Sequence, residues 1–436
     1  MTTFSGLVLI DHYLRLYRIH QRVRKTFKSF HFKGDYGIAD ILMCLLIMLM
    51  VGTQRLRHID FVKDDPLFKR IVRLTRIPHR TKLSTALKQF TSDSLKALAE
   101  LNAELVIEQI KQLGLDTVTI DLDGTVISTK GNPSWAFAGY NPIKRGAKSY
   151  FPLTAHVGQT GHFLSIVNRP GNVHDSNRAL SVIKTLRRQM ADFQIQFRAD
   201  SAFCVPDVIN YLRSRHHNFA IKVPFWKLNN LKAAVGQRKR WFRIDTRWSY
   251  FWVKNPIDSI DHDHWVMILR KKVKRCKGHY QLKLFSPDNG QFEYSAVVTE
   301  SKNWAPDDLL SFMAGRSAQE NSIGELKTSF AFDHVPTNMY QANSAYQQLS
   351  QMAYNLSISM QYGMGLATKR NCGKKVTRLY RTYEWRTLRF TFLNRAGRIV
   401  TLDGRKHLLV SENEATRSLY SRITSALVDV SRKLAA

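Results

Sequence analysis

The chain has 436 residues, of which 44% are hydrophobic, so it is long enough for a large core and for about two or three domains. Lys and Arg number 66 against 34 Asp and Glu, which gives a formal net charge of +32. Such an excess of cations points to a polyanionic partner, with nucleic acid first and an acidic membrane surface second. The basic residues are dispersed along the chain, which argues against a simple membrane-binding tail.

Cysteine usage and hydropathy indicate the compartment. The four cysteines lie far apart and form no CxxC pair, so we expect neither a zinc site nor a disulfide framework, and a reduced, cytoplasmic setting. The longest apolar run, residues 41–51, is too short to span a bilayer and too far from the N-terminus for a usual signal peptide. We expect a buried helix there and no membrane partner. The sequence has no Walker A motif, so we expect no nucleotide cofactor.

Residues 1–115 are expected to form an all-helical DNA-binding region. Residues 1–33 interleave Lys and Arg with aromatic side chains, as in YLRLYRIHQRVRKTFKSFHFK. This pattern fits either a solvated amphipathic helix or an arm that contacts DNA, and both interpretations stay open. Residues 38–115 carry helical periodicity up to the run SLKALAELNAELVIEQIKQL.

The periodicity changes at residue 116, where apolar and polar residues begin to alternate. Residues 117–123 predict a strand with one apolar and one polar face. Further strands and helices alternate up to residue 224, and the strand predicted at 193–199 delivers Asp200 at its end. Strands interleaved with helices indicate an α/β fold, whose first part we place at residues 116–224.

The remainder divides by composition. Residues 225–305 are rich in aromatic and β-branched side chains and predict an inserted antiparallel β-unit, with HYQLKLF (279–285) as one of its strands. Helices are expected to resume over residues 306–363 and to complete the α/β core. Residues 364–436 form a basic C-terminal region of mixed character.

Three acidic residues occupy suitable places for a metal site. Asp123 ends the first predicted strand in LDGT, Asp200 ends a later one in RADS, and Glu320 lies on a helix in RSAQENSIGELK. Neighbouring strand ends lie side by side, and three carboxylates at one spot suit Mg²⁺ or Mn²⁺. Asp121 shares a strand face with Asp123 and is a rival for the first position. Taken singly, strand-end aspartates are also common as turn or capping residues.

The Glu320 helix carries two cations beside the carboxylate. Arg316 precedes Glu320 by four residues and Lys327 follows it by seven, which places all three within roughly 40° of one helix face. A carboxylate between two cations suits a metal ion and a phosphodiester together. Solvated helices with ion pairs show the same spacing.

The set LDGTV, GYNPIKRG, the stretch from RPGNVHDSN to RADSAF, and FMAGRSAQENSIGELK resembles the DDE transposases of bacterial insertion sequences, of the insertion-sequence-four type, over residues 35–410. The resemblance implies an RNase H-like mixed-sheet catalytic core in which Asp123, Asp200 and Glu320 are catalytic and hold two Mg²⁺ or Mn²⁺ ions. That group carries a Tyr ahead of the Arg, Glu and Lys. Met313 stands at this position here, which removes a phosphate-binding hydroxyl.

The resemblance also implies a reaction and its partners. It implies cut-and-paste transposition of an insertion sequence: binding of terminal inverted repeats in double-stranded DNA, end cleavage, and strand transfer to target DNA by a homodimer in a synaptic complex. Arg316 and Lys327 would bind DNA phosphates near the cleaved end. Three tryptophans of the insertion either stack on a flipped base or pack the core of the β-unit: Trp241, Trp248 and Trp252.

Two further segments and two rival functions complete the expectations. Lys144, Arg145 and Lys148, in the loop GYNPIKRGAK, either contact DNA phosphates or are merely solvated, and His174-Asp175 is expected to form a turn. The rivals are a catalytically silent, transposase-derived DNA-binding protein and an RNase H-like nuclease acting in repair. The three intact carboxylates argue against the first, and the basic helical N-terminus argues against the second.

Overall fold

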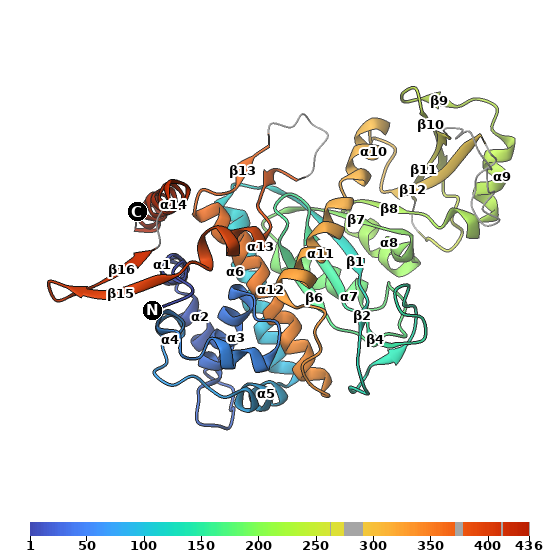
Figure 1. Cartoon of the computed structure of the whole chain (residues 1–436). Helices are drawn as coiled ribbons and strands as arrows, with labels where there is room; N and C mark the ends of the chain where they lie inside the picture. Colours follow the sequence, from blue (N-terminus) through green and yellow to red (C-terminus); the bar gives the residue numbers. More distant parts are fainter. Residues whose placement is uncertain (262, 274–290, 371–377, 411–412, 436) are drawn as a thin grey trace, which may run out of the picture.

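The computed structural model describes residues 1–261, 263–273, 291–370, 378–410 and 413–435. A large sheet forms its centre, with a helical layer on one side and a β-rich lobe on the other (Figure 1). The strand predicted at 279–285 lies outside the described residues.

The central sheet has nine strands in the order β6-β5-β1-β7-β8-β12-β11-β10-β9. β1 (Thr117–Gly124) pairs antiparallel with β5 (Leu153–Val157), which pairs antiparallel with β6 (Phe163–Val167). On its other side β1 pairs in parallel with β7 (Gln194–Ala199), which pairs in parallel with β8 (Asn218–Lys222). This order of antiparallel and parallel neighbours around a central first strand is that of the RNase H-like fold, so the predicted fold class is confirmed.

Both faces of β1 are covered, because helices pack on each side of the sheet. Val118, Ile120 and Leu122 are buried among residues of α7 (Ala179–Gln189) and α8 (Pro206–Ser214). The predicted polar face is also buried: Thr119 and Asp121 are almost inaccessible to solvent. The alternation of residue types predicted the polar face of this strand but not its burial. A central strand of a sheet covered by helices on both faces is enclosed on both sides, and its polar side chains need internal partners.

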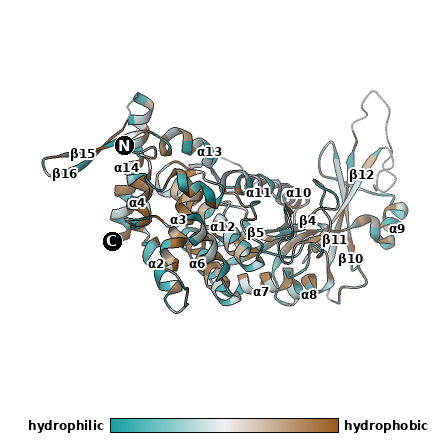
Figure 2. Ribbon diagram, turned by 60° about the horizontal axis from the view of Figure 1, so that its bottom comes forward, coloured by the Kyte–Doolittle hydropathy of each residue, from teal (hydrophilic) through white to brown (hydrophobic). Residues whose placement is uncertain are grey.

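The N-terminal residues form a helical layer that shares one hydrophobic core with α11 (Ser317–Phe330) and α12 (Tyr340–Gly363). Every residue of α3 (Ile38–Val51) except Asp40 is buried, which confirms the buried helix predicted from the apolar run. Figure 2 shows the hydrophobic residues of α3, α6 and α12 gathered where these helices meet. The layer consists of α1 (Leu7–Leu16), α2 (Ile19–Phe27), α3 (Ile38–Val51), η1 (Leu56–Phe61), α4 (Pro66–Val72), α5 (Arg80–Lys88) and α6 (Ser92–Gln112).

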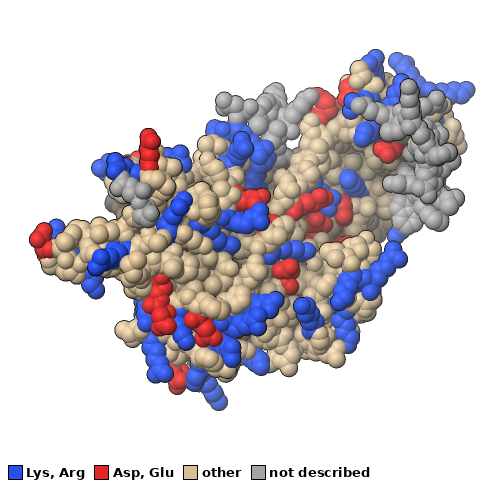
Figure 3. Space-filling view, viewed as in Figure 1, with Lys and Arg blue, Asp and Glu red and all other residues tan. Residues whose placement is uncertain are grey.

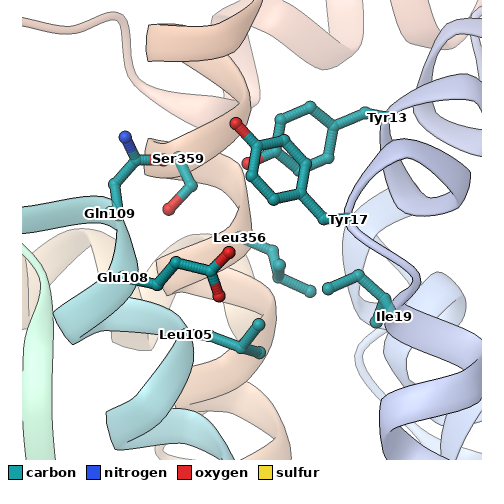
Figure 4. Close-up of a pocket in the computed structure, with 8 residues that line it drawn as sticks. All are labelled: Tyr13, Tyr17, Ile19, Leu105, Glu108, Gln109, Leu356 and Ser359. Atoms are coloured by element: carbon teal, nitrogen blue, oxygen red, sulfur yellow. The ribbon is translucent and has the colours of Figure 1, made fainter. Parts of the chain in front are cut away.

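Aromatic residues of the N-terminal segment take part in that core. Tyr13 and Phe27 are buried, and the rings of Tyr13 and Tyr17 stack with their centroids 4.6 Å apart. A small pocket lies beside them, between the helices of the layer and α12, and burial raises the pKa of Tyr13 well above its ordinary value (Figure 4). The pocket belongs to the helical layer and contains none of the predicted site residues. Its lining comprises Tyr13, Tyr17, Ile19, Leu105, Glu108, Gln109, Leu356 and Ser359.

The β-rich insertion extends the central sheet. β12 (Phe292–Thr299) pairs antiparallel with β8, and β11 (Trp265–Lys272), β10 (Trp248–Lys254) and β9 (Phe242–Arg243) follow in antiparallel order. η3 (Phe225–Lys227) and α9 (Asn229–Gln237) precede these strands, and α10 (Pro306–Ala314) returns the chain to α11.

Shorter elements complete the molecule. A small sheet in the order β2-β4-β3 follows β1, and the C-terminal hairpin of β15 and β16 extends away from the body (Figure 1). No helix in the described ranges is long and apolar enough to cross a membrane. The remaining elements are β2 (Ile127–Ser128), β3 (Phe137–Ala138), β4 (Lys148–Tyr150), η2 (Ser201–Phe203), β13 (Thr368–Lys369), β14 (Tyr380–Arg381), α13 (Trp385–Leu388), the π-helical turn η4 (Arg389–Leu393), β15 (Gly397–Leu402), β16 (Arg405–Val410) and α14 (Glu414–Ala435).

Candidate active site

Asp123 and Asp200 lie side by side at the ends of two neighbouring strands. β1 and β7 are parallel, and Leu122 is opposite Ala199 in their register, so the next residue of each strand is an aspartate at the same edge. Asp200 is also the N-cap residue of η2, where its Oδ1 accepts a hydrogen bond of 3.1 Å from the backbone N–H of Ala202. The structure therefore brings together the two strand-end carboxylates that the sequence singled out.

Arg316 joins these two carboxylates. Its Nη2 lies 3.1 Å from Asp123 Oδ1 and 3.3 Å from Asp200 Oδ2. Arg316 is the N-cap residue of α11, and its side chain is largely buried. The guanidinium thus occupies the space between the two aspartates, where its positive charge offsets their mutual repulsion.

Glu320 and Lys327 lie on α11 around the end of β1. Glu320 is exposed in the first turn, and its charge is among those that raise the pKa of Asp123. Lys327 Nζ donates a 3.0 Å hydrogen bond to the carbonyl of Val126, just beyond β1, and burial lowers the pKa of this amine. Helix α10 ends at Ala314 and α11 begins at Ser317, and Gly315 and Arg316 between them keep helical φ and ψ angles.

Asp123 has an unusual titration. Its pKa is raised to about 7, first because the carboxyl is buried, and further because Asp200, Asp175 and Glu320 add negative charge, while Arg316 lowers it. A cluster of carboxylates with a raised pKa is typical of sites that bind cations or transfer protons. In Figure 3, acidic side chains gather over α10 and α11, with Lys and Arg side chains around them.

Asp175 is a fourth carboxylate at this site, and the sequence predicted it only as part of a turn. A Cβ added to Gly124 would lie 1.9 Å from Asp175 Oδ1, so the glycine of LDGT permits the close approach of this side chain. Burial and the charge of Asp200 raise the pKa of Asp175. Arg169 Nη2 lies 3.8 Å from Asp175 Oδ1, an oxygen that accepts no hydrogen bond within the described part of the chain. In the sequence, the pair His174-Asp175 within RPGNVHDSN was the signal that could have indicated this carboxylate.

Asp121 has a different environment from its rival Asp123. It is completely buried and paired with Arg198, whose Nη2 lies 2.9 Å from Asp121 Oδ2. Arg198 Nη1 also donates to the carbonyl of Phe312 in α10, and Gln319 Nε2 of α11 donates to the carbonyl of Asp121 at 3.3 Å. This network joins the ends of β1 and β7 to α10 and α11, and Asp121 is enclosed within it.

The tryptophans of the insertion are partly buried. The ring of Trp241 packs edge-on against Phe251 with centroids 4.7 Å apart, and the guanidinium of Arg270 lies 4.4 Å from the Trp241 centroid. Trp248 and Trp252 pack against a small apolar cluster. Met313 is buried in this same cluster, so its side chain packs under the insertion.

The basic loop lies on the small sheet. Lys144, Arg145 and Lys148 are exposed, and Lys148 Nζ donates a 2.9 Å hydrogen bond to Asn132 Oδ1. Their side chains are therefore available to a partner on this surface, apart from the contact of Lys148.

The carboxylates at the strand ends are candidate ligands for a divalent metal ion. Within the described ranges, no group of three His, Cys, Asp or Glu side chains is close enough to hold a metal ion as it stands. Two of the required carboxylates, Asp123 and Asp200, nevertheless already share one cationic partner, and Glu320 is exposed on the adjacent helix turn. Carboxylate oxygens are the ligands that Mg²⁺ and Mn²⁺ prefer, so the residues fit such an ion.

An RNase H-like sheet with paired aspartates at the ends of its first and fourth core strands is the architecture of DDE-type enzymes. The chain belongs to the family described as Transposase DDE domain group 1, whose family model matches residues 1–432. It matches no curated protein.

Solved structures of transposases resemble this chain at low sequence identity. One is a piggyBac transposase synaptic complex with hairpin DNA, at 8% identity and a TM-score of 0.47, covering 94% of this chain and 77% of that chain. Another is the Mos1 strand transfer complex, at 12% identity and a TM-score of 0.18, covering 48% of this chain and 66% of that chain. The Mos1 mariner paired end complex with Mn has 13% identity and a TM-score of 0.17, covering 50% and 72%.

Proposed function

We propose that this protein cleaves the ends of a mobile DNA element and joins them to target DNA, with Asp123, Asp200 and Glu320 as the catalytic carboxylates. The observation that carries the proposal is the placement of Asp123 and Asp200 at adjacent strand ends around one cation. Membership of a DDE transposase family supports the same reaction class.

The residues of this site would have different roles in the reaction: the carboxylates would bind metal, and the cations would bind DNA phosphates. Asp123 and Asp200 would hold Mg²⁺ or Mn²⁺ through carboxylate oxygens, and Glu320 would add a third carboxylate from α11. Two bound ions supply stabilisation of the attacking and leaving oxygens of a phosphoryl transfer. Arg316, which pairs with Asp123, and Lys327, which bonds to the carbonyl of Val126, would bind phosphate oxygens of the DNA beside the carboxylates.

The partners follow from the charge and the proposed reaction. A net charge of +32 suits double-stranded DNA, both element ends and target. Residues 1–115 would recognise the terminal repeats, and two copies of the chain would hold two ends together in a synaptic complex. The reaction would take place on DNA in the cytoplasm of a bacterium.

The test uses the full chain and the DNA that flanks its gene. Linear DNA carrying both flanking sequences is incubated with the protein and Mg²⁺ or Mn²⁺, and cleavage is measured beside binding. We expect cleavage at the element ends by the wild type. Asp200→Asn and Glu320→Gln are expected to bind the ends and leave them uncut. Asp192→Asn is the matched control, because that aspartate is exposed and pairs only with Lys111 among the described residues.

Each alternative outcome has a definite meaning. Cleavage that survives in Asp200→Asn or Glu320→Gln would remove that residue from the site. Specific binding of the ends without cleavage by the wild type would instead indicate a silent, transposase-derived DNA-binding protein.

A further inference from the structure

Residues 125–150 present an unusual cluster of exposed apolar side chains. Four large side chains are open to solvent within nine residues: Trp135 is 60% exposed, Phe137 44%, Tyr140 76% and Ile143 84%. Exposed apolar side chains that lie together on a folded protein often mark a site that binds a partner. We call residues 125–150 the aromatic-basic surface.

The same segment carries four cationic side chains. The aromatic-basic surface contains Lys130, Lys144, Arg145 and Lys148, all exposed, and its sequence has no Asp or Glu. Figure 1 shows β2 and β4 at an edge of the molecule, and Figure 3 shows Lys and Arg side chains along the same edge. Rings with positive charge beside them suit a partner that carries both flat apolar groups and negative charge.

Backbone contacts hold the exposed tryptophan in place. Trp135 has a φ of +63°, a left-handed conformation that a bulky residue keeps only where its surroundings impose it. The preceding residue, Ser134, supplies that constraint. Its N–H donates to the carbonyl of Asn338 at 2.8 Å, its Oγ accepts from Tyr340 N–H at 2.8 Å, and its carbonyl accepts from Tyr150 Oη at 2.8 Å. These hydrogen bonds fix the backbone next to Trp135, and its indole is exposed from that fixed position.

A buried asparagine shapes the basic turn. Asn141 is only 4% exposed, and its Oδ1 accepts hydrogen bonds from the N–H groups of Ile143 and Lys144 at 3.2 and 2.9 Å. Its Nδ2 donates to Ser128 Oγ at 2.9 Å, which ties the turn to β2. The turn that carries Ile143, Lys144 and Arg145 outward is therefore built into the fold.

The aromatic-basic surface adjoins the carboxylates. It begins directly after Gly124, and Lys327 of α11 holds its first residues through the carbonyl of Val126. Gly139 lies so close to the carbonyl of Gly171 that a Cβ there would be 1.9 Å from it, and Gly171 belongs to the loop that carries Asp175. DNA bound at Asp123 and Asp200 would therefore continue past this surface.

Charge and base stacking favour DNA over a second copy of the chain as the partner of the aromatic-basic surface. A second copy of the chain carries the same net charge of +32 and would bring like charges together, whereas DNA brings phosphates. Bases within an intact duplex are already stacked on one another, so exposed rings gain contact only where bases are unpaired. We propose that the aromatic-basic surface binds DNA with locally unpaired bases beside the active site, with Trp135 and Tyr140 stacking on bases and the cations holding phosphates. The proposal rests on the proposed function, because both concern the same bound DNA.

The test compares two DNA molecules without cleavage. The full chain, in EDTA, is titrated with a duplex and with the same duplex containing a short unpaired bubble with 2-aminopurine at an unpaired position. Wild type is expected to bind the bubble more tightly and to change the 2-aminopurine fluorescence. The double variant Trp135→Ala/Tyr140→Ala should lose about 30-fold or more in affinity for the bubble, because each of the two stacked bases contributes roughly 5- to 150-fold, with duplex affinity nearly unchanged. Phe390→Ala is the matched control, because Phe390 is 74% exposed on η4.

The outcomes separate this inference from the proposed function. Equal affinity of the wild type for both DNA molecules, or an unchanged bubble affinity in the double variant, would overturn the inference and leave the proposed function standing. A double variant that loses self-association, measured by sedimentation, but keeps bubble binding would also overturn it in favour of a second copy as the occupant. Absence of any DNA binding by the folded wild type would count against both proposals. Circular dichroism checks that the variants fold.

Discussion

Arg316 Nη2 lies 3.1 Å from Asp123 Oδ1, and the same nitrogen is 3.3 Å from Asp200 Oδ2. One guanidinium therefore offsets the charge of two carboxylates. The arrangement links the first strand of the sheet, the parallel strand beside it and the start of α11.

Replacement of Arg316 should make the stability of the protein depend on an added divalent cation. Arg316→Gln leaves Asp123 and Asp200 facing each other without a positive charge, and we expect a loss of about 1–3 kcal/mol in the free energy of unfolding at pH 8 in EDTA. Addition of Mn²⁺ should raise the melting temperature of the variant more than that of the wild type. Thermal denaturation with and without Mn²⁺ measures both effects. Arg398→Gln, at an exposed residue of β15, is the control, and an equal Mn²⁺ response in all three proteins would contradict the prediction.

The stability of the metal-free protein should fall as the pH rises from about 4 to about 7. The pKa of Asp123 is about 7 in the folded protein against 3.8 ordinarily, so between these values the folded state holds a proton that the unfolded state releases. Stability from this group is present at pH 4 and is lost as the pH passes 7. Asp123→Asn removes the titration, and we expect the variant to gain stability over the wild type at pH 8, by at most about 4 kcal/mol, and little at pH 4.

Urea denaturation at several pH values in EDTA measures this difference. Asp192→Asn serves as the exposed control. A stability difference between Asp123→Asn and the wild type that stays constant from pH 4 to pH 8 would show that Asp123 is ionised normally in the folded protein.

The two aspartates of β1 should respond differently to mutation. Asp121 pairs with Arg198 in the protein interior, and removal of one partner leaves a buried charge without its counter-charge. Asp121→Asn is therefore expected to cost about 3–5 kcal/mol of the free energy of unfolding. A combined Asp121→Leu/Arg198→Met variant should recover part of this loss. Urea denaturation measures these values, and a stable Asp121→Asn variant that fails to cleave DNA would restore Asp121 as a catalytic candidate.

The salt dependence of DNA binding should report the exposed cations of the small sheet. Each phosphate contact contributes about 0.9 to the slope of log K against log salt concentration on duplex DNA. If all three side chains contact phosphates, Lys144→Ala/Arg145→Ala/Lys148→Ala should reduce the slope by about 2.7. Fluorescence anisotropy across a salt series measures it, with Lys111→Ala as the control. A triple variant with the wild-type slope would place the phosphate contacts elsewhere.

Several features were predictable from the sequence because they depend on local patterns. Alternation along residues 117–123 predicted β1, and the apolar run at 41–51 predicted a buried helix. The positions of Asp123 and Asp200 at strand ends followed from where these patterns stop, and parallel pairing of the two strands then made the aspartates neighbours. The motifs also predicted the RNase H-like core and the family, since both depend on residue types in a fixed order.

Other features depend on contacts between residues far apart in the sequence, which no local pattern encodes. Only the folded chain shows that Asp121 is enclosed with Arg198, that Asp175 reaches over Gly124, and that Met313 is buried beneath the insertion. The tertiary structure also determines which groups the Arg316 side chain contacts. Helical spacing specifies which side of a helix a residue occupies, but burial against two strand ends determines which charges that residue meets.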